Sequence, residues 1–431
     1  MTHSHFELRL PGCWPGPVPT PVLIPILLAV VMTAMSCSPD DSAPGESLIV
    51  SKTIYVSPND DLQQELDRAA DSGVQTVVLR KGTYRPGRAG QTLIVLTKRH
   101  DGLIIRAEAT DGVVLTASNP ELAQPEDASY PAIVNHVILT GNGVSHRTII
   151  DGVTITGANG YADQSAAILH SRYPEFQGNL KPGMFFILDG GAVKVFANSA
   201  PQFQNCTIVG NRTQLCGGGV SIEQSYQSAE PVRFKNCVFR ENHCPATGAA
   251  VDVLAGGLAE FENCLFVGNI ANTGMDEIAK QTGLTYNEKH GCGALTVFPD
   301  SRVHVRNCTF TANWNGVDDH GSGSVYENSI FWMNDAWDES RPGKPYELDV
   351  FESAVVSGCF IHGQIADLRG TVSPQQNTLG EFDPRFDEQF QPTTSACQTA
   401  GYRQLPQTRS PVVAEEPVNA DKKDPGRAAE R

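Results

Sequence analysis

Apolar and polar residues alternate in short runs along most of the chain, and one such run occurs five times between residues 203 and 335. Each copy has an apolar residue two positions before an asparagine and more apolar residues just after it. Alternation with period two predicts two short β-strands, with a bend at the asparagine between them. The copies are FQNCTIVGN, FKNCVFREN, FENCLFVGN, VRNCTFTAN and YENSIFWMN, centred on Asn205, Asn236, Asn263, Asn307 and Asn328, which we expect to stack as a ladder of amides.

A second phrase, rich in glycine and alanine, precedes the first one. It reads GGAVKVF, GGGVSIE, GAAVDVL, CGALTVF and, more weakly, GSGSVYE, beginning at Gly190, Gly217, Gly248, Cys292 and Gly321. Small residues allow a tight turn into a strand, and alternate apolar residues then point inward. The positions between them are expected to face solvent and any ligand: Lys194, Ser221, Glu223, Asp252 and Thr296. The irregular spacing of the copies favours a solenoid whose stacked coils carry loops.

Together the two phrases resemble those of right-handed parallel β-helix proteins of the pectate-lyase-like superfamily. In particular, they are similar to bacterial surface proteins with recurring G-G-G-I and N-C-T-F-x-x-N phrases. The resemblance covers residues 51–404 and implies an all-β fold, a right-handed parallel β-helix solenoid. It leaves the function open, because this fold carries lyases, hydrolases, isomerases, adhesins and inert stalks.

An amphipathic stretch near the start of the solenoid predicts a helix over residues 61–70. Leu62 and Leu66 share one face of it, and Asp60 or Asp61 is available as the N-cap. Such a helix would cover the open end of the first coil, which otherwise exposes core and unpaired strand edges. The fold prediction therefore includes an N-terminal capping helix.

Residues 1–37 are typical of an export signal. Residues 21–35 are apolar and uncharged but too short for a comfortable membrane span. Ala34-Met35-Ser36-Cys37 resembles a bacterial lipoprotein signal, which implies lipidation of Cys37, but the expected leucine three residues earlier is missing. An ordinary cleaved signal peptide is an equal alternative. We expect an outer-membrane or cell-surface lipoprotein that touches the membrane only through its lipid, or otherwise a periplasmic or secreted protein.

The remaining boundaries follow from composition. Residues 38–50 are polar and suit a flexible tether, residues 51–403 hold the solenoid, and residues 404–431 are proline-rich and charged, which predicts disorder. Asp383-Pro384-Arg385-Phe386 resembles a C-terminal module of bacterial β-helix surface proteins that reads D-P-x-F. The resemblance implies that this segment closes the C-terminal end of the solenoid.

The net charge limits the possible partners, and the positions of the cysteines indicate their oxidation state. The formal net charge is −16, so nucleic acid is not expected as a partner. Of the 11 cysteines, several share one repeat position, which favours a column of free, buried thiols: Cys206, Cys237, Cys264, Cys308 and Cys359. Disulfides among the other cysteines stay open. A single solenoid domain of this kind is expected to be a monomer.

Two insertions interrupt the regular coils, at residues 158–186 and 270–290. Long loops in a solenoid often carry binding chemistry. Cleavage of an acidic polysaccharide by a lyase needs a base and a cation that neutralises the uronate carboxylate. The candidates are Lys194, His290 and His320 as catalytic residues; Arg212, Glu223, His243 and Asp252 as substrate-binding residues; and Asp276, Glu277, Asp318 and Asp319 as ligands of Ca²⁺.

Alternatives to these assignments remain. Charged residues in adjacent coils also suit ordinary surface ion pairs, and neighbouring aspartates on one strand face opposite ways. The leading hypothesis is an exported protein that binds an acidic extracellular polysaccharide. Whether it also cleaves the polysaccharide is open, with a lyase as first choice and a glycoside hydrolase as second. The rival is a non-catalytic adhesin or structural surface protein.

Overall fold

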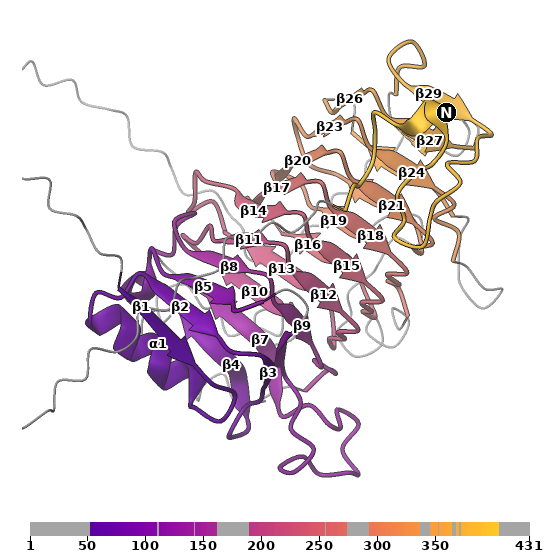
Figure 1. Ribbon diagram of the computed structural model, residues 1–431. Helices are drawn as coiled ribbons and strands as arrows, with labels where there is room; N and C mark the ends of the chain where they lie inside the picture. Colours follow the sequence, from indigo (N-terminus) through magenta and orange to yellow (C-terminus); the bar gives the residue numbers. More distant parts are fainter. Residues whose placement is uncertain are drawn as a thin grey trace, which may run out of the picture. The chain divides into compact units, whose positions relative to one another are not determined.

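The computed structural model describes residues 52–404 except 110–111, 142, 162–188, 255, 274–292, 337–344, 352, 364–367 and 370–371. The described residues belong to one compact unit. Their strands form three parallel sheets, which the chain visits in turn, coil after coil (Figure 1). This confirms the right-handed parallel β-helix predicted from the repeats. None of the helices in these ranges is long and apolar enough to cross a bilayer.

The three sheets are called A, B and C. Sheet A contains β1 (Thr53–Val56), β2 (Thr76–Leu79), β5 (Ile104–Ala107), β8 (Ile149–Asp151), β11 (Gln202–Gln204), β14 (Val232–Lys235), β17 (Leu258–Glu262), β20 (Arg302–Arg306), β23 (Val325–Glu327) and β26 (Val355–Ser357). Sheet B contains β3 (Gly82–Tyr84), β6 (Val113–Thr116), β9 (Thr154–Thr156), β12 (Thr207–Val209), β15 (Val238–Arg240), β18 (Leu265–Val267), β21 (Thr309–Thr311), β24 (Ile330–Trp332), β27 (Phe360–His362) and β29 (Thr378–Gly380). Sheet C contains β4 (Gly90–Leu96), β7 (Val134–Thr140), β10 (Val193–Phe196), β13 (Val220–Glu223), β16 (Val251–Val253), β19 (Leu295–Val297), β22 (Val317–Asp319), β25 (Leu348–Val350) and β28 (Leu368–Arg369).

The repeated asparagines form the bend between sheets A and B. All five have φ between +47° and +54°, the left-handed region that a short polar side chain tolerates better than most. Glycines occupy the same bend in two other coils, at Gly152 and Gly358. The bend predicted at the asparagine is therefore confirmed.

Helix α1 (Leu62–Asp71) lies at the start of the solenoid. Asp61 is its N-cap and accepts a hydrogen bond from the N–H of Gln64 at 3.1 Å. Leu62, Leu66 and Ala69 are buried in the same apolar core as the first strands. The capping helix expected from the amphipathic pattern is confirmed.

Parallel register places identical residues above one another, so the core is built from columns. Phe203, Phe234 and Phe261 stack with ring centroids 5.1 and 5.2 Å apart. A second stack in sheet B contains Phe266 and Phe310, 4.2 Å apart. The cysteine column is buried as well, and the eight cysteines in the described ranges form no disulfide with one another.

A buried row of amides, here called the interior amide ladder, follows the ends of the sheet B strands. Each Nδ2 donates to the Oδ1 of the next coil at 3.1, 3.0, 2.9 and 2.7 Å. Its members are Asn211, Asn242, Asn269, Asn313 and Asn334, all at most 1% exposed. The last amide donates to Glu347 Oε2 at 2.5 Å. The ladder thus ends on a buried carboxyl group.

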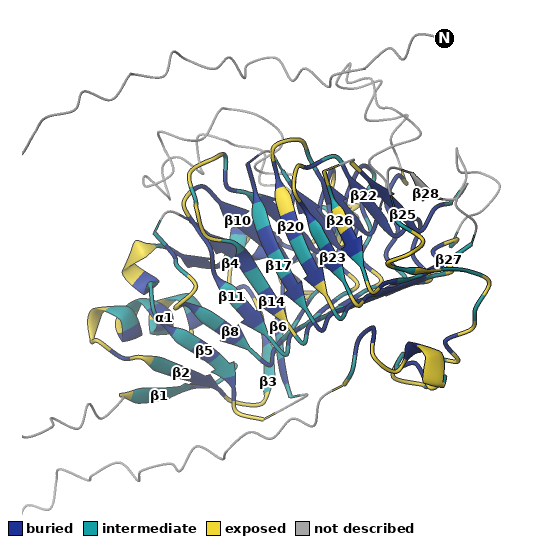
Figure 2. Cartoon of the chain, turned by 90° about the horizontal axis from the view of Figure 1, so that it is seen from above, coloured by how far each residue is buried: buried dark blue, intermediate teal, exposed yellow. Residues whose placement is uncertain are grey.

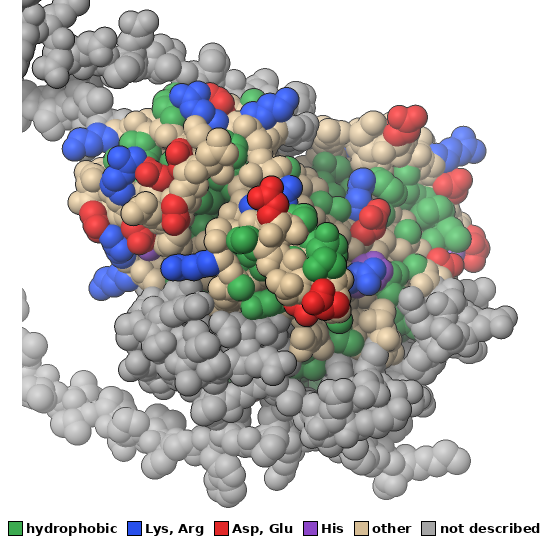
Figure 3. Space-filling model, turned by 90° about the horizontal axis from the view of Figure 1, so that it is seen from below, with side chains coloured by type: hydrophobic (Ala, Val, Ile, Leu, Met, Phe, Trp, Pro, Cys, Tyr) green, Lys and Arg blue, Asp and Glu red, His purple; other side chains and the backbone are tan. Residues whose placement is uncertain are grey.

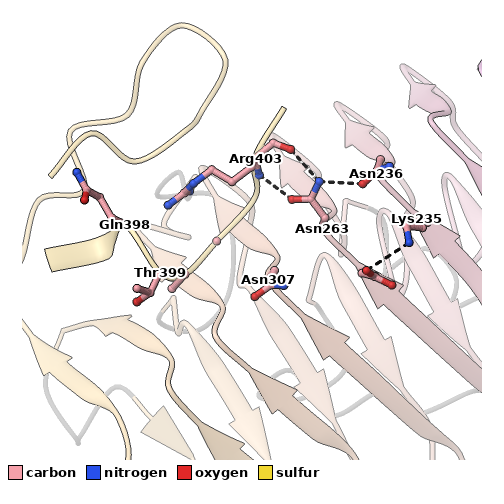
Figure 4. A pocket seen from close by; sticks show the side chains of 10 residues that line it. Lys235, Asn236, Asn263, Asn307, Gln398, Thr399 and Arg403 are labelled. Carbon is pink, nitrogen blue, oxygen red and sulfur yellow. Dashed lines mark hydrogen bonds and ion pairs between the residues drawn. The ribbon is translucent and has the colours of Figure 1, made fainter. Parts of the chain in front are cut away.

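The asparagines of the bend make a second, outer ladder. Asn236 Nδ2 donates to Asn205 at 3.1 Å, and Asn263 Nδ2 donates to Asn236 at 2.9 Å. The ladder then stops, because the main chain of Arg403 both donates to Asn263 and accepts from it, each at 2.7 Å (Figure 4). The predicted amide ladder is therefore confirmed over three of its five asparagines, and Asn307 is the first that does not join it.

Residues 382–404, here called the C-terminal segment, pack beside the coils. Tyr402 is buried against Leu265 and Val267 on the outward face of sheet B. Farther along, Trp332 Nε1 donates to the carbonyl of Phe382 at 2.9 Å. These contacts lie on the outward face of sheet B, and closure of the C-terminal end by this segment stays a prediction.

The outward face of sheet A carries charged pairs between neighbouring coils. Arg233 bonds Glu260 at 3.0 Å, and Glu262 is bonded by Lys235 at 3.4 Å and Arg306 at 3.1 Å. These side chains are 30–46% exposed. Figure 2 shows the corresponding alternation of buried and partly exposed residues along the strands of this sheet.

Candidate functional site

The outward face of sheet C carries the candidate residues in one column. Parallel register aligns the column from β10 to β25. Its members are Lys194, Ser221, Asp252, Thr296, Asp318 and Asp349, and each is at most 7% exposed. The expectation that these positions face solvent was wrong, although they do point away from the core.

Connections that lead from sheet B into sheet C supply hydrogen bonds to this column. Thr247 Oγ1 donates to Asp252 Oδ1 at 3.1 Å, and the N–H of Gly248 donates to Thr296 Oγ1 at 3.0 Å. Both donors lie between β15 and β16. The column is thus covered partly by its own chain, which strand alternation alone does not predict.

The first cluster on this face surrounds Lys194. Its Nζ lies 2.7 Å from Glu223 Oε2, 3.1 Å from Ser221 Oγ and 3.8 Å from Asp189 Oδ2. Burial acts to lower the pKa of Lys194, but the charges of Glu223 and Asp189 outweigh it and raise that pKa. Lys194 is therefore a buried cation, unsuited to the catalytic base role predicted for it.

The acids of this cluster hold protons unusually well. Burial raises the pKa of Asp189 to about 7, partly offset by the charge of Lys194. Burial and the neighbouring Asp189 also raise the pKa of Asp252 well above its usual range. Asp252, predicted to bind substrate, is fully buried and so does not meet a ligand at the surface.

Arg212 and His243 lie in the connections that lead into β13 and β16. They are bridge partners in adjacent coils, and the same row continues to Ile270. Arg212 is exposed and His243 is half-buried. Of the predicted substrate-binding residues, these two and the partly exposed Glu223 are accessible.

A second cluster lies at the end of β22. His320 Nε2 is 2.9 Å from Asp318 Oδ1; the His320 side chain is 30% exposed, whereas that of Asp318 is fully buried. Burial acts to lower the pKa of His320, but the hydrogen bond and charge of Asp318, with Asp349 and Asp319, raise it overall. The exposed ring of Phe351 lies edge-on to the imidazole, with centroids 6.2 Å apart.

Asp319 does not fit the predicted calcium site. Its register partners are Val297 and Val350 in the inward column, so it points away from Asp318. Both of its oxygens are bonded inside: Oδ1 by the N–H of Gly321 and Oδ2 by the hydroxyl of Tyr326, each at 2.7 Å. The two aspartates cannot share an ion, because they lie on opposite faces of one strand.

The other predicted ligands, Asp276 and Glu277, lie outside the described residues, as do His290 and Cys37. Within the described ranges, no three His, Cys, Asp or Glu side chains are grouped as metal ligands. Calcium stays a prediction, and no step below depends on it.

The two clusters do not converge on one reacting bond. Four strand spacings separate β10 from β22, which amounts to about 19 Å. Lys194 and His320 therefore cannot act together as the sequence suggested. The exposed cluster at His320 is the better candidate for chemistry.

A separate groove of about 360 Å³ lies between the bend of sheets A and B and the C-terminal segment (Figure 4). Lys235, Asn307 and Arg403 are among its lining residues. None of the predicted site residues lines it. On the face drawn in Figure 3, acidic, basic and apolar side chains are interspersed.

Sequence reasoning missed three members of these clusters. Asp189 directly precedes the Gly190-Gly191 turn, Asp349 continues the outward column, and Phe351 follows it at the next outward position. The prediction of a fifth glycine-rich copy at residues 321–327 was wrong, because its strand is β23 of sheet A. Sheet C continues through β22 and β25 instead, so the repeat pattern did not point to the last two. A carboxylate directly before a glycine turn was the signal for the first.

Comparison with known proteins agrees with the fold. The family described as "Right handed beta helix region" matches residues 134–288, from β7 to beyond β18. No curated protein matches the sequence.

Solved structures offer only distant likenesses. A pectin methyl esterase of the rice weevil has 12% identity and a TM-score of 0.33, with 74% of this chain and 78% of that one covered. A pectate lyase has 12% identity and a TM-score of 0.34, with 72% and 78% covered. The A-module of a mannuronan C-5 epimerase from Azotobacter vinelandii has 12% identity and a TM-score of 0.34, with 74% and 90% covered. These likenesses carry no argument about the chemistry of this chain.

Proposed function

We propose that this protein binds an acidic extracellular polysaccharide along sheet C and cleaves it by β-elimination, with His320 transferring the proton. The observation that carries the proposal is the partly exposed imidazole whose Nε2 lies 2.9 Å from Oδ1 of the fully buried Asp318. A carboxylate behind a histidine fixes its tautomer and stabilises the charged ring, as general acid–base chemistry requires. With Nε2 turned to Asp318, Nδ1 is the nitrogen that would accept the substrate proton.

The surroundings of His320 support a saccharide as ligand. The parallel hydrogen bonding of sheet C extends one residue beyond β22, because the N–H of His320 donates to the carbonyl of Val297 at 2.8 Å. His320 is therefore aligned with the outward residues that follow the neighbouring strands. Neighbouring outward positions hold Phe298, which is half-buried, and Phe351, which is 52% exposed. Apolar ring faces of this kind suit the carbon-bound hydrogens of a sugar, and a saccharide could follow the row from coil to coil.

One positive group supports an acidic chain over a neutral one. Arg212 is exposed and precedes β13, three coils from His320, so it can bind a carboxylate elsewhere along the same polymer. The raised pKa of His320 keeps its imidazole protonated to higher pH than an isolated imidazole. The base itself must be neutral, so the reaction rate should rise with pH through the raised pKa of His320.

The test is ultraviolet absorbance of unsaturated uronate during incubation of the purified protein with acidic and neutral polysaccharides, with and without Ca²⁺. We expect product from an acidic polymer and a loss of at least about a hundredfold in turnover for His320→Gln. The matched control is His304→Gln, because His304 pairs with Glu327 at 2.9 Å on sheet A and is similarly exposed. It should retain activity.

Absence of product from every polymer, with the protein folded, would reject cleavage. Retained binding would then favour a non-catalytic adhesin, and absence of binding a structural role. The proposal also places the protein outside the cell, where such polymers occur, in agreement with the apolar segment at residues 21–35. Fractionation of cells that express the full chain tests this, and recovery in the cytoplasm would contradict it.

A further inference from the structure

Lys194 and Asp189 meet in surroundings that suit covalent chemistry rather than an ion pair alone. Both side chains are completely buried, and Lys194 Nζ lies 3.8 Å from Asp189 Oδ2. The two residues flank the turn that leads into β10, so their separation is fixed by a short piece of chain. We propose that Lys194 and Asp189 form an intramolecular isopeptide bond between the lysine Nζ and the aspartate Cγ. This proposal is independent of the proposed function.

The two oxygens of the Asp189 carboxyl group have different surroundings. Its Oδ1 accepts a hydrogen bond from the N–H of Cys216 at 3.3 Å, whereas Oδ2 is the oxygen that lies nearest Lys194. No hydrogen bond is made to Oδ2 within the described residues. A main-chain N–H on Oδ1 would stabilise the negative charge that develops there during attack. Oδ2 is thereby the oxygen placed to leave.

Glu223 is positioned as the proton carrier. Its Oε2 lies 2.7 Å from Lys194 Nζ, closer than any atom of Asp189. Its side chain is 24% exposed, so it can exchange protons with solvent, which the two buried partners cannot do. The cluster therefore places a nucleophile, Lys194, beside both an electrophile and a base.

The step balances without a further reactant. The Lys194 ammonium gives one proton to the Glu223 carboxylate and becomes a neutral amine. The amine nitrogen bonds to Cγ of the protonated Asp189, the Cγ–Oδ2 bond breaks, and Oδ2 leaves as water with its own proton and one from the nitrogen. The products are an amide, one water and a protonated Glu223, which releases its proton to solvent.

Burial favours the neutral form of Asp189 and the product, whereas the raised pKa of Lys194 keeps its amine protonated until Glu223 takes the proton. An ionised carboxylate does not react with an amine, but burial raises the pKa of Asp189 to about 7, so the neutral acid is well populated near neutral pH. Formation of an amide also removes two ionisable groups from a site where charge is costly. Exclusion of bulk water then slows the reverse reaction.

The bond would tie the Gly190-Gly191 turn to the first residues of β10. This is where the chain re-enters sheet C after the first insertion. Gly190 has a φ of +77°, so the turn already requires a conformation that other residues rarely adopt. A covalent link across it would hold this entry point when the insertion is pulled or cut.

Intact-protein mass spectrometry of the purified, denatured full chain tests the proposal. We expect a mass lower by one water than the sequence requires. Trypsin cannot cleave after an acylated lysine, so residues 173–212 should stay in one fragment that also lacks one water. Without the bond, cleavage after Lys194 should give two fragments, 173–194 and 195–212, at their full masses, and that result would overturn the proposal.

Three variants separate the bond from other losses of water. Lys194→Arg and Glu223→Gln should both restore the full mass, the second while leaving the reacting pair in place. Asp189→Asn should lose one ammonia instead, since its amide nitrogen becomes the leaving group. A succinimide at Asp189-Gly190 also lacks one water, but it would persist in Lys194→Arg and would not block trypsin. That pattern would likewise overturn the proposal.

Discussion

The outward faces of sheets A and C look alike in sequence and differ in the structure. On both faces, strand alternation turns polar side chains away from the core. On sheet A these side chains are 30–46% exposed and pair across coils, as Lys235 does with Glu262. On sheet C the corresponding column is at most 7% exposed. Alternation therefore gives the direction of a side chain, but the segments packed outside the sheet decide whether it meets water.

This difference changes what each charge costs. An exposed ion pair gains little, because water and salt screen it. A buried ionisable group must be compensated by partners or must become neutral. Asp189 and Asp252 show the second response, since burial raises their pKa values. Sheet A is thus a solvated surface, whereas sheet C holds groups whose protonation depends on the fold.

The sharpest test replaces one lysine on each face. Lys194→Met removes both the buried amine and the proposed cross-link, leaves Glu223 and Asp189 without that partner, and should lower the free energy of unfolding by at least about 3 kcal/mol. Lys235→Met removes an exposed partner of Glu262 and should cost less than about 1 kcal/mol. Urea denaturation followed by circular dichroism measures both. Equal effects would show that the two faces do not differ as described.

A second test uses Glu347, at the entry to β25. Burial raises its pKa to about 7, although Asn334 donates to it from both its side chain and its main chain. Because the pKa of Glu347 is higher in the folded than in the unfolded protein, proton binding by Glu347 stabilises the folded state. This stabilisation is complete below the unfolded-state pKa and is lost as pH rises through about 7. Its full size is roughly 3 kcal/mol.

Glu347→Gln should remove this pH dependence. The glutamine oxygen can still accept from the interior amide ladder, so the variant should be more stable than the natural protein at mildly alkaline pH and similar at acidic pH. Thermal midpoints of the two proteins across that range measure the difference. A constant difference at all pH values would show that Glu347 does not titrate with folding.

The smallest expected effect compares two tyrosines. Tyr326→Phe removes the buried hydroxyl that donates to Asp319 at 2.7 Å and should cost about 1–3 kcal/mol. Tyr226→Phe removes a hydroxyl that donates to Asp300 at 3.0 Å from a ring that is 64% exposed. The exposed change should be close to neutral in the same denaturation experiment. A larger cost at Tyr226 would contradict the argument from burial.

The repeats predicted the fold because each relevant rule is local. An asparagine at a bend, an Asp before an amphipathic run and a cysteine at a fixed repeat position depend only on nearby residues, and these predictions are confirmed by Asn236, Asp61 and Cys237. The interior amide ladder is different. Asn242 is a polar residue in the core, and only the coils above and below supply its partners. One repeat by itself gives no sign of them.

The candidate site was harder to predict for the same reason. Lys194 was found because it occupies an outward position, and Asp318 because it belongs to a run of acidic residues. Their burial and their separation depend on connections and coil number. His320 was selected because histidine is a common acid–base residue. Its pairing with Asp318 and its contact with Phe351 could be recognised only from the structure. Whether His290, Asp276 and Glu277 join this site stays a prediction, because they lie outside the described residues.

The C-terminal segment has a consequence for how the protein is made. Arg403 binds Asn263, a residue translated 140 positions earlier, and Tyr402 covers Leu265 and Val267 beside it. As a nascent chain leaves the ribosome, this apolar strip of sheet B forms early but is covered only when the last coils and the segment have followed. A chain stopped short of Arg403 would keep the strip open to other nascent chains, so complete translation protects the finished coils from aggregation.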